Sequence, residues 1–212
     1  FGAGIGMRSL WNPNEPVYGE GTREMIATGD YFIPKVNAIT YSDKPVFYFW
    51  AMAAGCLLTG GMSEAGLRLP SVLWGILSVL LLYWLPRRVF GIRAGFLAAA
   101  CLATTVMFWW HSQYIQMDQL LSFQILATLV FFFAAREMPG GRNALMFAVA
   151  GAFMGLAFLT KGPVGIVLPA AVMGIYLILV KEPLWIFRRE TVWMTCAFIL
   201  VAAPWYAAVA LT

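Results

Sequence analysis

Ionisable side chains are scarce in this sequence, and five of them could carry out acid–base or electrostatic chemistry. Three are carboxylates and two are lysines, and all stand in a polar stretch or at the end of an apolar run: Glu15, Asp43, Lys44, Asp118 and Lys161. A carboxylate can accept a proton from an attacking group, and a lysine can stabilise negative charge on a leaving group. Ionisable groups at the ends of long apolar runs are costly and often functional. These five residues are therefore candidates for a site.

Each candidate also has an ordinary structural explanation. Asp118 begins an apolar run, where the dipole of a helix favours an acid. Lys161 could reach from a helix end to a membrane interface. Asp43 and Lys44 could form a surface ion pair, and Glu15 could cap a following helix. Both interpretations stay open at this point.

The composition indicates an integral membrane protein. Of the 212 residues, 61% are hydrophobic and only 11% are charged, and the mean hydropathy is +0.77. Soluble domains carry roughly 25% charged residues, so a soluble enzyme and a disordered chain are both excluded. The net charge of +4 forms no basic stripe, which argues against a nucleic-acid partner. The three cysteines lie in apolar runs and His111 stands alone, so neither residue type indicates a metal or redox centre.

Residues 10–44 form the only long polar stretch. Within it, Pro16 could begin a short helix and Gly29 could end it, and residues 33–41 are predicted to be an extended loop. The apolar run over 45–58 is short for a membrane span, which needs about 20 residues. Its aromatic residues favour a helix that lies in, or re-enters, the membrane interface.

Six longer apolar runs are predicted to cross the membrane: 67–85, 94–111, 119–135, 143–160, 163–180 and 192–211. Pro70, Pro163 and Pro169 are expected at or near helix starts, where a missing N–H costs little. Gly151 and Gly155 form a small-residue face suited to close helix packing. The predicted fold is all-α, a polytopic transmembrane helical bundle with interfacial helices in the first outer loop.

The expected organisation is that of the N-terminal part of a longer membrane domain. Residues 1–9 would be the tail of a first span, residues 10–60 an outer loop, and residues 67–211 about six transmembrane helices. No repeat with a period of 20–50 residues and no low-complexity linker is visible in the sequence.

Charge distribution predicts the orientation. If the spans alternate in direction, eight basic and three acidic residues fall on one side, and six basic and seven acidic residues on the other. Lys and Arg are enriched in cytoplasmic loops, so the first side is predicted to be cytoplasmic. Residues 10–44, together with Asp118 and Lys161, then face the outer side.

Several short motifs occur in an order that resembles one superfamily. They are the run from Asn14-Glu15-Pro16 to Gly29-Asp30, Tyr41-Ser42-Asp43-Lys44-Pro45 with the aromatic residues that follow it, Arg68-Leu69-Pro70-Ser71, the segment that begins at Asp118, Thr160-Lys161-Gly162-Pro163, and Pro204-Trp205. The combination resembles the lipid-linked-sugar glycosyltransferases of the GT-C superfamily. Within them it is similar to the branch that contains protein O-mannosyltransferases and bacterial aminoarabinose lipid A transferases. The resemblance covers essentially all 212 residues.

The resemblance implies an inverting sugar transferase whose active site faces the periplasm at the bacterial inner membrane. Its donor would be a polyprenyl-phosphate-linked sugar and its acceptor a lipid or a protein. Glu15, Asp118 and Asp43 would be the catalytic acids. Contacts with the donor phosphate or the substrate would come from six residues: Asn14, Tyr18, Arg23, Tyr41, Lys44 and Lys161. A divalent metal ion could take part, with Asp43 as a ligand, since some relatives bind one.

The sequence departs from the family pattern at Asn14. Members commonly carry an Asp–Glu pair in the first loop, whose Asp is the usual candidate for the base, and Asn14 cannot accept a proton. Either Glu15 or Asp118 takes that role, or this chain is weak or specialised. The resemblance further implies more spans and a soluble outer domain beyond residue 212, so the isolated chain is not expected to be active.

Two other functions remain open. A transporter or flippase for a lipid-linked sugar is expected to show inverted repeats and polar groups near the bilayer midplane, and the charges here gather on one face instead. A non-catalytic membrane subunit or an inactive homologue is kept open by Asn14.

Overall fold

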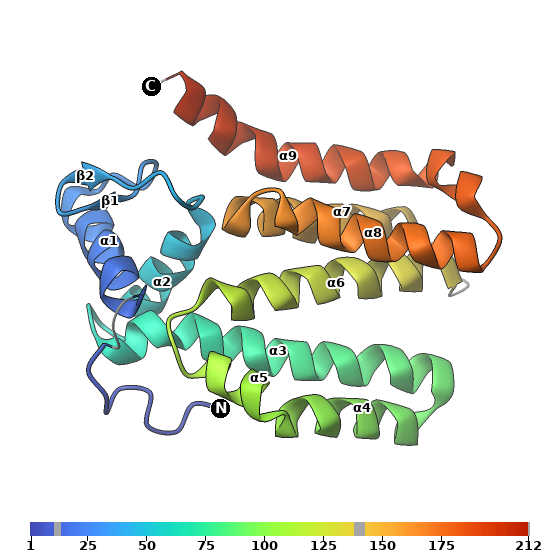
Figure 1. The fold of residues 1–212 in the computed structure, drawn as a ribbon, viewed down its shortest axis with the longest axis horizontal. Coiled ribbons are helices and arrows are strands. Elements are labelled where there is room, and N and C mark those ends of the chain that lie inside the picture. The colour runs from blue at the N-terminus through green and yellow to red at the C-terminus, as the bar shows by residue number, and fades with distance from the viewer. Residues whose placement is uncertain (11–13, 138–142, 212) are drawn as a thin grey trace. The chain divides into compact units, whose positions relative to one another are not determined.

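The structure of the protein, a computed structural model, describes residues 1–10, 14–137 and 143–211. Over these ranges the chain is helical apart from a short two-stranded ribbon and connecting turns (Figure 1). The predicted all-α, polytopic class is thereby confirmed. The chain divides into two compact units, Phe1–Phe123 and Gln124–Thr212, and the boundary falls inside helix α6 (Met117–Glu137).

The first unit holds the segment that was predicted to be an outer loop. In chain order it contains α1 (Asn14–Thr28), β1 (Lys35–Val36), β2 (Ile39–Thr40), α2 (Phe47–Leu58), α3 (Glu64–Phe90), α4 (Ile92–Thr104), α5 (Val106–Ser112) and the start of α6. Helix α1 is the helix expected between Pro16 and Gly29, and it begins slightly earlier. Gly29 ends it in a left-handed conformation with φ of 72°, and its N–H bonds to the Met25 carbonyl at 3.1 Å.

The prediction of an extended loop over 33–41 is wrong in part, because β1 and β2 form an antiparallel hairpin. Its two-residue turn places Asn37 and Ala38 at φ of 55° and 61°, the left-handed values that match the twist of a tight hairpin. Glu24 of α1 accepts a hydrogen bond from the Ala38 N–H at 3.0 Å. The carboxylate thus fixes a turn that the residue types alone do not favour.

Helix α2 is the short apolar helix predicted over 45–58, and it packs closely on α3. A side-chain carbon at Gly55 would collide with the carbonyl oxygen of Gly66. That carbonyl is open to close approach because Pro70, one turn later, has no N–H to bond to it. Pro70 was expected at or near a helix start, but it lies inside α3, whose first residue follows the Ser63 cap.

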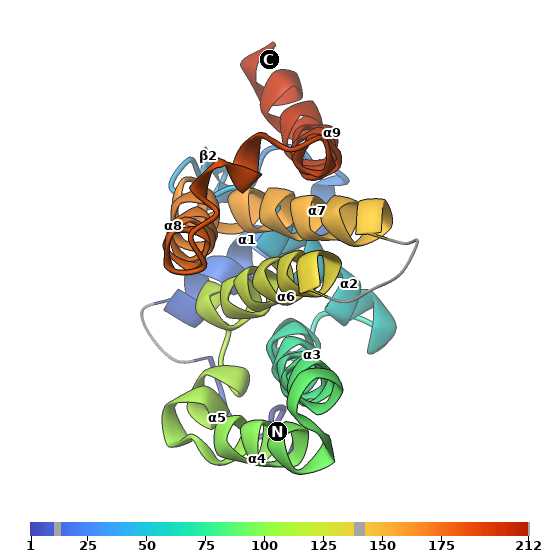
Figure 2. The same ribbon diagram turned by 90° about the vertical axis from the view of Figure 1, so that its right-hand side faces the viewer.

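The second unit begins within α6 and continues with α7 (Asn143–Lys161), α8 (Val164–Leu179), the 3-10 helix η1 (Pro183–Phe187) and α9 (Glu190–Ala210). Helix α7 lies beside both α8 and α9 (Figure 2). Gly151 faces the main chain of Met194, and Gly155 faces Val201. The predicted small-residue face therefore lets α7 and α9 approach closely.

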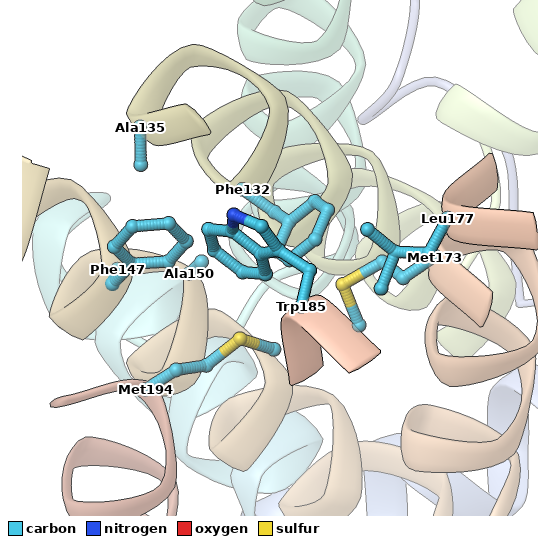
Figure 3. Close-up of a cluster of buried hydrophobic side chains, with 8 residues drawn as sticks. All are labelled: Phe132, Ala135, Phe147, Ala150, Met173, Leu177, Trp185 and Met194. Atoms are coloured by element: carbon cyan, nitrogen blue, oxygen red, sulfur yellow. The ribbon is translucent and has the colours of Figure 1, made fainter. Parts of the chain in front are cut away.

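The core of this unit is an aromatic and methionine cluster (Figure 3). The indole of Trp185, from η1, lies 5.7 Å from the ring of Phe132 and 5.3 Å from that of Phe147, centroid to centroid. The cluster fastens the turn between α8 and α9 onto α6 and α7. Pro169 was also expected near a helix start, but it lies inside α8.

Within the described ranges, four helices are long and apolar enough to cross a membrane by themselves: α3, α6, α7 and α9. The run 94–111 was predicted to be one span, but it is broken into α4 and α5, which are bent by 67°. The break falls at Thr105, whose hydroxyl bonds back to the Cys101 carbonyl at 2.8 Å and whose main chain is extended. The run 163–180 forms α8, whose 16 residues extend about 24 Å, less than the hydrocarbon core.

Candidate active site

A buried ion pair joins Arg68 of α3 to Glu15 of α1. Arg68 Nε and Nη2 donate to the two carboxylate oxygens of Glu15 at 2.9 and 2.8 Å, and the two side chains are 0% and 3% exposed. Buried charges are tolerated only when they are paired and hydrogen-bonded. Arg68 meets this condition fully, since its three other N–H groups donate to the carbonyls of Ile5, Arg8 and Ser9.

Glu15 also contacts the segment that leads into α6. Its Oε1 accepts a hydrogen bond from the Ile115 N–H at 2.8 Å, just before the helix turn that carries Asp118. Arg8 makes a second connection, because its guanidinium lies 4.3 Å from the centroid of the Tyr114 ring. The segment that leads into α6 is therefore held by Glu15 of α1 and by Arg8, which precedes that helix.

Four aromatic rings gather where α1, the loop after the hairpin and α2 meet. The ring of Tyr18 packs edge-on against those of Tyr41, Tyr48 and Phe49, with centroids 5.7 to 6.4 Å apart. Tyr41 and Phe49 contact each other in the same way. Such edge-to-face packing is favourable beyond the burial it brings, so these rings form a defined wall.

The charges of two carboxylates influence the Tyr18 hydroxyl. Burial first, then the charge and hydrogen bonding of Tyr41 and the negative charges of Asp118 and Asp43, together raise the pKa of Tyr18 to about 12. Asp43 and Asp118 are both exposed to solvent. The structure thus brings together four of the residues that the sequence predicted, namely Tyr18, Tyr41, Asp43 and Asp118.

The remaining predicted residues lie around this group or apart from it. Asn14 is exposed as the first residue of α1, and Lys44 is half-buried directly after Asp43. Lys161 is half-buried in the last turn of α7, in the second unit.

Arg23 lies on another face of α1. It forms an ion pair with Glu20 at 2.6 Å, and its hydrogen bond is the main cause that lowers the pKa of Glu20. Both residues line an open cavity of about 460 Å³ between α1, the hairpin and the start of α3. Arg23 is the only predicted site residue among the described residues that line this cavity.

The family resemblance also allowed a divalent metal ion with Asp43 as a ligand. Among residues 1–10, 14–137 and 143–211, no three His, Cys, Asp or Glu side chains come together in a way that could hold an ion. The described residues therefore do not fit a protein-built metal cage around Asp43.

Arg68 was part of a motif in the sequence, but no role was predicted for it. The available signal was a positive charge just inside an apolar run, where it needs a compensating partner. The identity of that partner could not be read from spacing, because Glu15 lies 53 residues earlier in the chain.

The fold and this site define a polytopic helical membrane protein whose site residues come from α1, the loop after the hairpin and the first turn of α6. The chain belongs to the dolichyl-phosphate-mannose-protein mannosyltransferase family, whose profile matches residues 43–207. The family resemblance drawn from the sequence is thereby confirmed.

Several curated relatives are described as bacterial arabinosyl transferases. The undecaprenyl phosphate-alpha-4-amino-4-deoxy-L-arabinose arabinosyl transferase of Edwardsiella ictaluri is 29% identical over 205 residues, which is 96% of this chain and 37% of the relative. That of Aeromonas salmonicida is 30% identical over 207 residues, 97% of this chain and 38% of the relative. The chain thus spans a little over a third of the length of these relatives.

Solved structures also match this chain over almost its whole length. ArnT from Cupriavidus metallidurans in the apo state matches 99% of this chain and 39% of its own, with a TM-score of 0.92 and 28% identity. ArnT bound to undecaprenyl phosphate matches with the same TM-score and 29% identity. The arrangement of helices found here is therefore that of a known membrane fold.

Proposed function

We propose that this chain forms part of a membrane glycosyltransferase that moves a sugar from a polyprenyl-phosphate donor to a lipid or protein acceptor. The reaction takes place on the periplasmic side of the bacterial inner membrane. The observation that carries the proposal is the group formed by Asp118, Asp43, Tyr18 and Tyr41. It is supported by a fold shared with a protein that was solved with undecaprenyl phosphate bound.

Asp118 is the proposed base. It is exposed in the first turn of α6, where the helix dipole favours the ionised carboxylate. In the reaction it accepts the proton of the acceptor hydroxyl as that oxygen forms a bond to the anomeric carbon. The bond from this carbon to the phosphate oxygen breaks, and its electron pair stays on the departing phosphate.

Lysines stabilise the departing phosphate in this proposal. Lys44 follows Asp43 directly and has part of its side chain exposed, and the sequence motif adds Lys161 as a second cation. An ammonium group interacts more strongly with the phosphate as its charge grows, so it lowers the barrier rather than only binding the donor. Asp43 orients the donor. Tyr18 donates a hydrogen bond to the substrate, because its raised pKa keeps the phenol protonated.

Glu15 has a different role in this proposal from the catalytic one expected from the sequence. Its Oε1 accepts from Arg68 and Ile115, and its Oε2 accepts from Arg68. A base must offer a lone pair to the substrate. Glu15 is buried, and both of its oxygens already accept hydrogen bonds from the protein. We therefore assign it to positioning the start of α6.

The test is sugar transfer by the full-length protein from a radiolabelled polyprenyl-phosphate sugar, with Asp118→Asn as the variant. We expect the rate to fall by about 10²-fold or more, in line with loss of a general base. Glu64→Gln is the matched control, since Glu64 stands in the first turn of α3 on the same predicted side of the membrane. Transfer by Asp118→Asn at the wild-type rate would rule out Asp118 as the base.

A second candidate function is a non-catalytic subunit or an inactive homologue. It is favoured by Asn14 at the position where the family commonly has an Asp, and by the closed surroundings of Glu15 next to it. A wild-type protein that binds the labelled donor but transfers no sugar would support this candidate.

A further inference from the structure

The turn between α8 and α9 holds a lysine in a conformation that favours glycine. Lys181 has a φ of 60°. Its N–H bonds to the Ile178 carbonyl at 3.0 Å, and the next N–H, of Glu182, bonds to the Leu177 carbonyl at 2.9 Å. This is the Schellman pattern that ends many helices, and its left-handed position is normally glycine. A lysine there is strained, which points to a use for its side chain.

The same turn is fixed by Arg136, the last basic residue of α6. Its guanidinium forms ion pairs with Glu182 and Glu137, both at 3.0 Å, and its side chain is only 9% exposed. It lies against the rings of Tyr176 and Trp185, 5.1 and 5.5 Å from their centroids. Arg136 thus holds η1 in place and offsets part of the charge of Glu182, because it is shared with Glu137.

The ion pair of Glu182 matters because Glu182 is the only acid among the described residues that line an open cavity at this turn. The cavity has a volume of about 370 Å³ and is lined by Lys181, Glu182, Pro183, Leu184, Trp185 and Arg188. Among the described residues, neither Lys181 nor Arg188 has an ion-pair partner. The cavity therefore offers two positive charges against one acid, whose own charge is partly offset by Arg136.

Apolar side chains surround these charges. Leu184 and Phe187 of η1 are 75% and 83% exposed, whereas Trp185 between them is buried in the aromatic and methionine cluster. Exposed apolar side chains beside Lys and Arg suit the level of lipid headgroups, where apolar groups face acyl chains and charges face water. By charge, this is the predicted cytoplasmic side, where basic pockets between helices bind anionic headgroups.

We propose that this cavity binds the phosphate of an anionic phospholipid, with Lys181 and Arg188 on the phosphate and the acyl chains along Leu184 and Phe187. The exposed apolar residues favour a lipid over a free phosphate ion, since an ion would gain nothing from them. The site lies at the opposite end of α8 from Lys161, so it is independent of the proposed transfer reaction.

The test uses the full-length protein in a neutral detergent, with its unfolding temperature measured by a thermal shift. Phosphatidylglycerol, phosphatidylcholine and inorganic phosphate are added in parallel at equal concentration. We expect phosphatidylglycerol to raise the unfolding temperature by several degrees, and the other two to have less than a third of that effect. An equal shift with inorganic phosphate would overturn the lipid assignment, and an equal shift with phosphatidylcholine would overturn the need for anionic charge.

Two variants and a control connect the effect to this cavity. Lys181→Gly and Arg188→Gln should each reduce the shift caused by phosphatidylglycerol by more than half. Because glycine relieves the strained conformation, Lys181→Gly without lipid should unfold at the wild-type temperature or above, which separates lost binding from lost folding. Arg88→Gln removes an exposed charge on the same predicted side and should leave the shift unchanged. A full shift in both cavity variants would refute the proposal.

Discussion

Arg68 and Glu15 lie 53 residues apart in the chain and form a doubly hydrogen-bonded ion pair closed off from water. The pair joins α1 to α3, and Glu15 extends the connection to the N–H of Ile115 before α6. A single buried carboxylate therefore determines where three elements of the candidate site stand. Glu15 therefore affects function by positioning these elements, because both of its carboxylate oxygens accept hydrogen bonds from Arg68 or Ile115.

Replacing Arg68 should destabilise the protein strongly. Arg68→Met leaves the charge of Glu15 buried without its guanidinium counter-charge and removes the donors of three main-chain carbonyls, a loss of about 3–5 kcal/mol. The measurement is thermal or denaturant unfolding in detergent. Arg68→Lys should rescue little, because an ammonium has three donors where five are used. A Met variant as stable as the wild type would contradict this account.

The Tyr18 phenol should ionise unusually late. Since its pKa is raised to about 12, mainly by burial, the difference in absorbance near 295 nm between wild type and Tyr18→Phe should titrate around pH 12 rather than pH 10. The folded-state pKa lies above that of the unfolded chain. Stability from this group is therefore complete below pH 10 and is lost as the pH rises towards 12. A difference titration centred at pH 10 would show that the hydroxyl is open to water.

Close packing of α7 on α9 should not tolerate a methyl group at Gly151. A Cβ there would collide with the Met194 carbonyl, whereas Gly174 in α8 has open space around it. Gly151→Ala should lower the free energy of unfolding by about 1–3 kcal/mol through overpacking. Gly174→Ala, a matched change in the same unit, should leave stability unchanged or raise it by up to about 1 kcal/mol. Equal effects of the two changes would argue against this helix contact.

The positions of the helices could be predicted from the sequence because long apolar runs between charged residues have few alternatives in a membrane. The break at Thr105 could not, since no Pro or Gly marks the position where the main chain becomes extended. The hairpin was missed for a similar reason. Its turn depends on the carboxylate of Glu24, which lies in another element.

The candidate site was predictable in part. Tyr18, Tyr41, Asp43 and Asp118 were singled out from the sequence, and in the structure they lie together. What residue types and spacing could not reveal was which acid is enclosed. Glu15 and Asp118 look alike as acids near the start of a helix, but Glu15 is buried against an arginine that is distant in the chain, whereas Asp118 is exposed.

Asn14 allows a gain-of-function test of the proposed reaction. It is exposed as the first residue of α1, beside the enclosed Glu15, and an acid at this position of a helix is favoured by the dipole. Asn14→Asp should therefore fold normally and raise the rate of sugar transfer by about tenfold or more, since a second carboxylate becomes available as a base. Asn14→Ala is the control and should not raise the rate, and Asn14→Asp combined with Asp118→Asn shows whether the new acid can replace Asp118. If Asn14→Asp leaves the rate unchanged while Asp118→Asn abolishes transfer, Asp118 is sufficient as the base and Asn14 serves only the start of the helix.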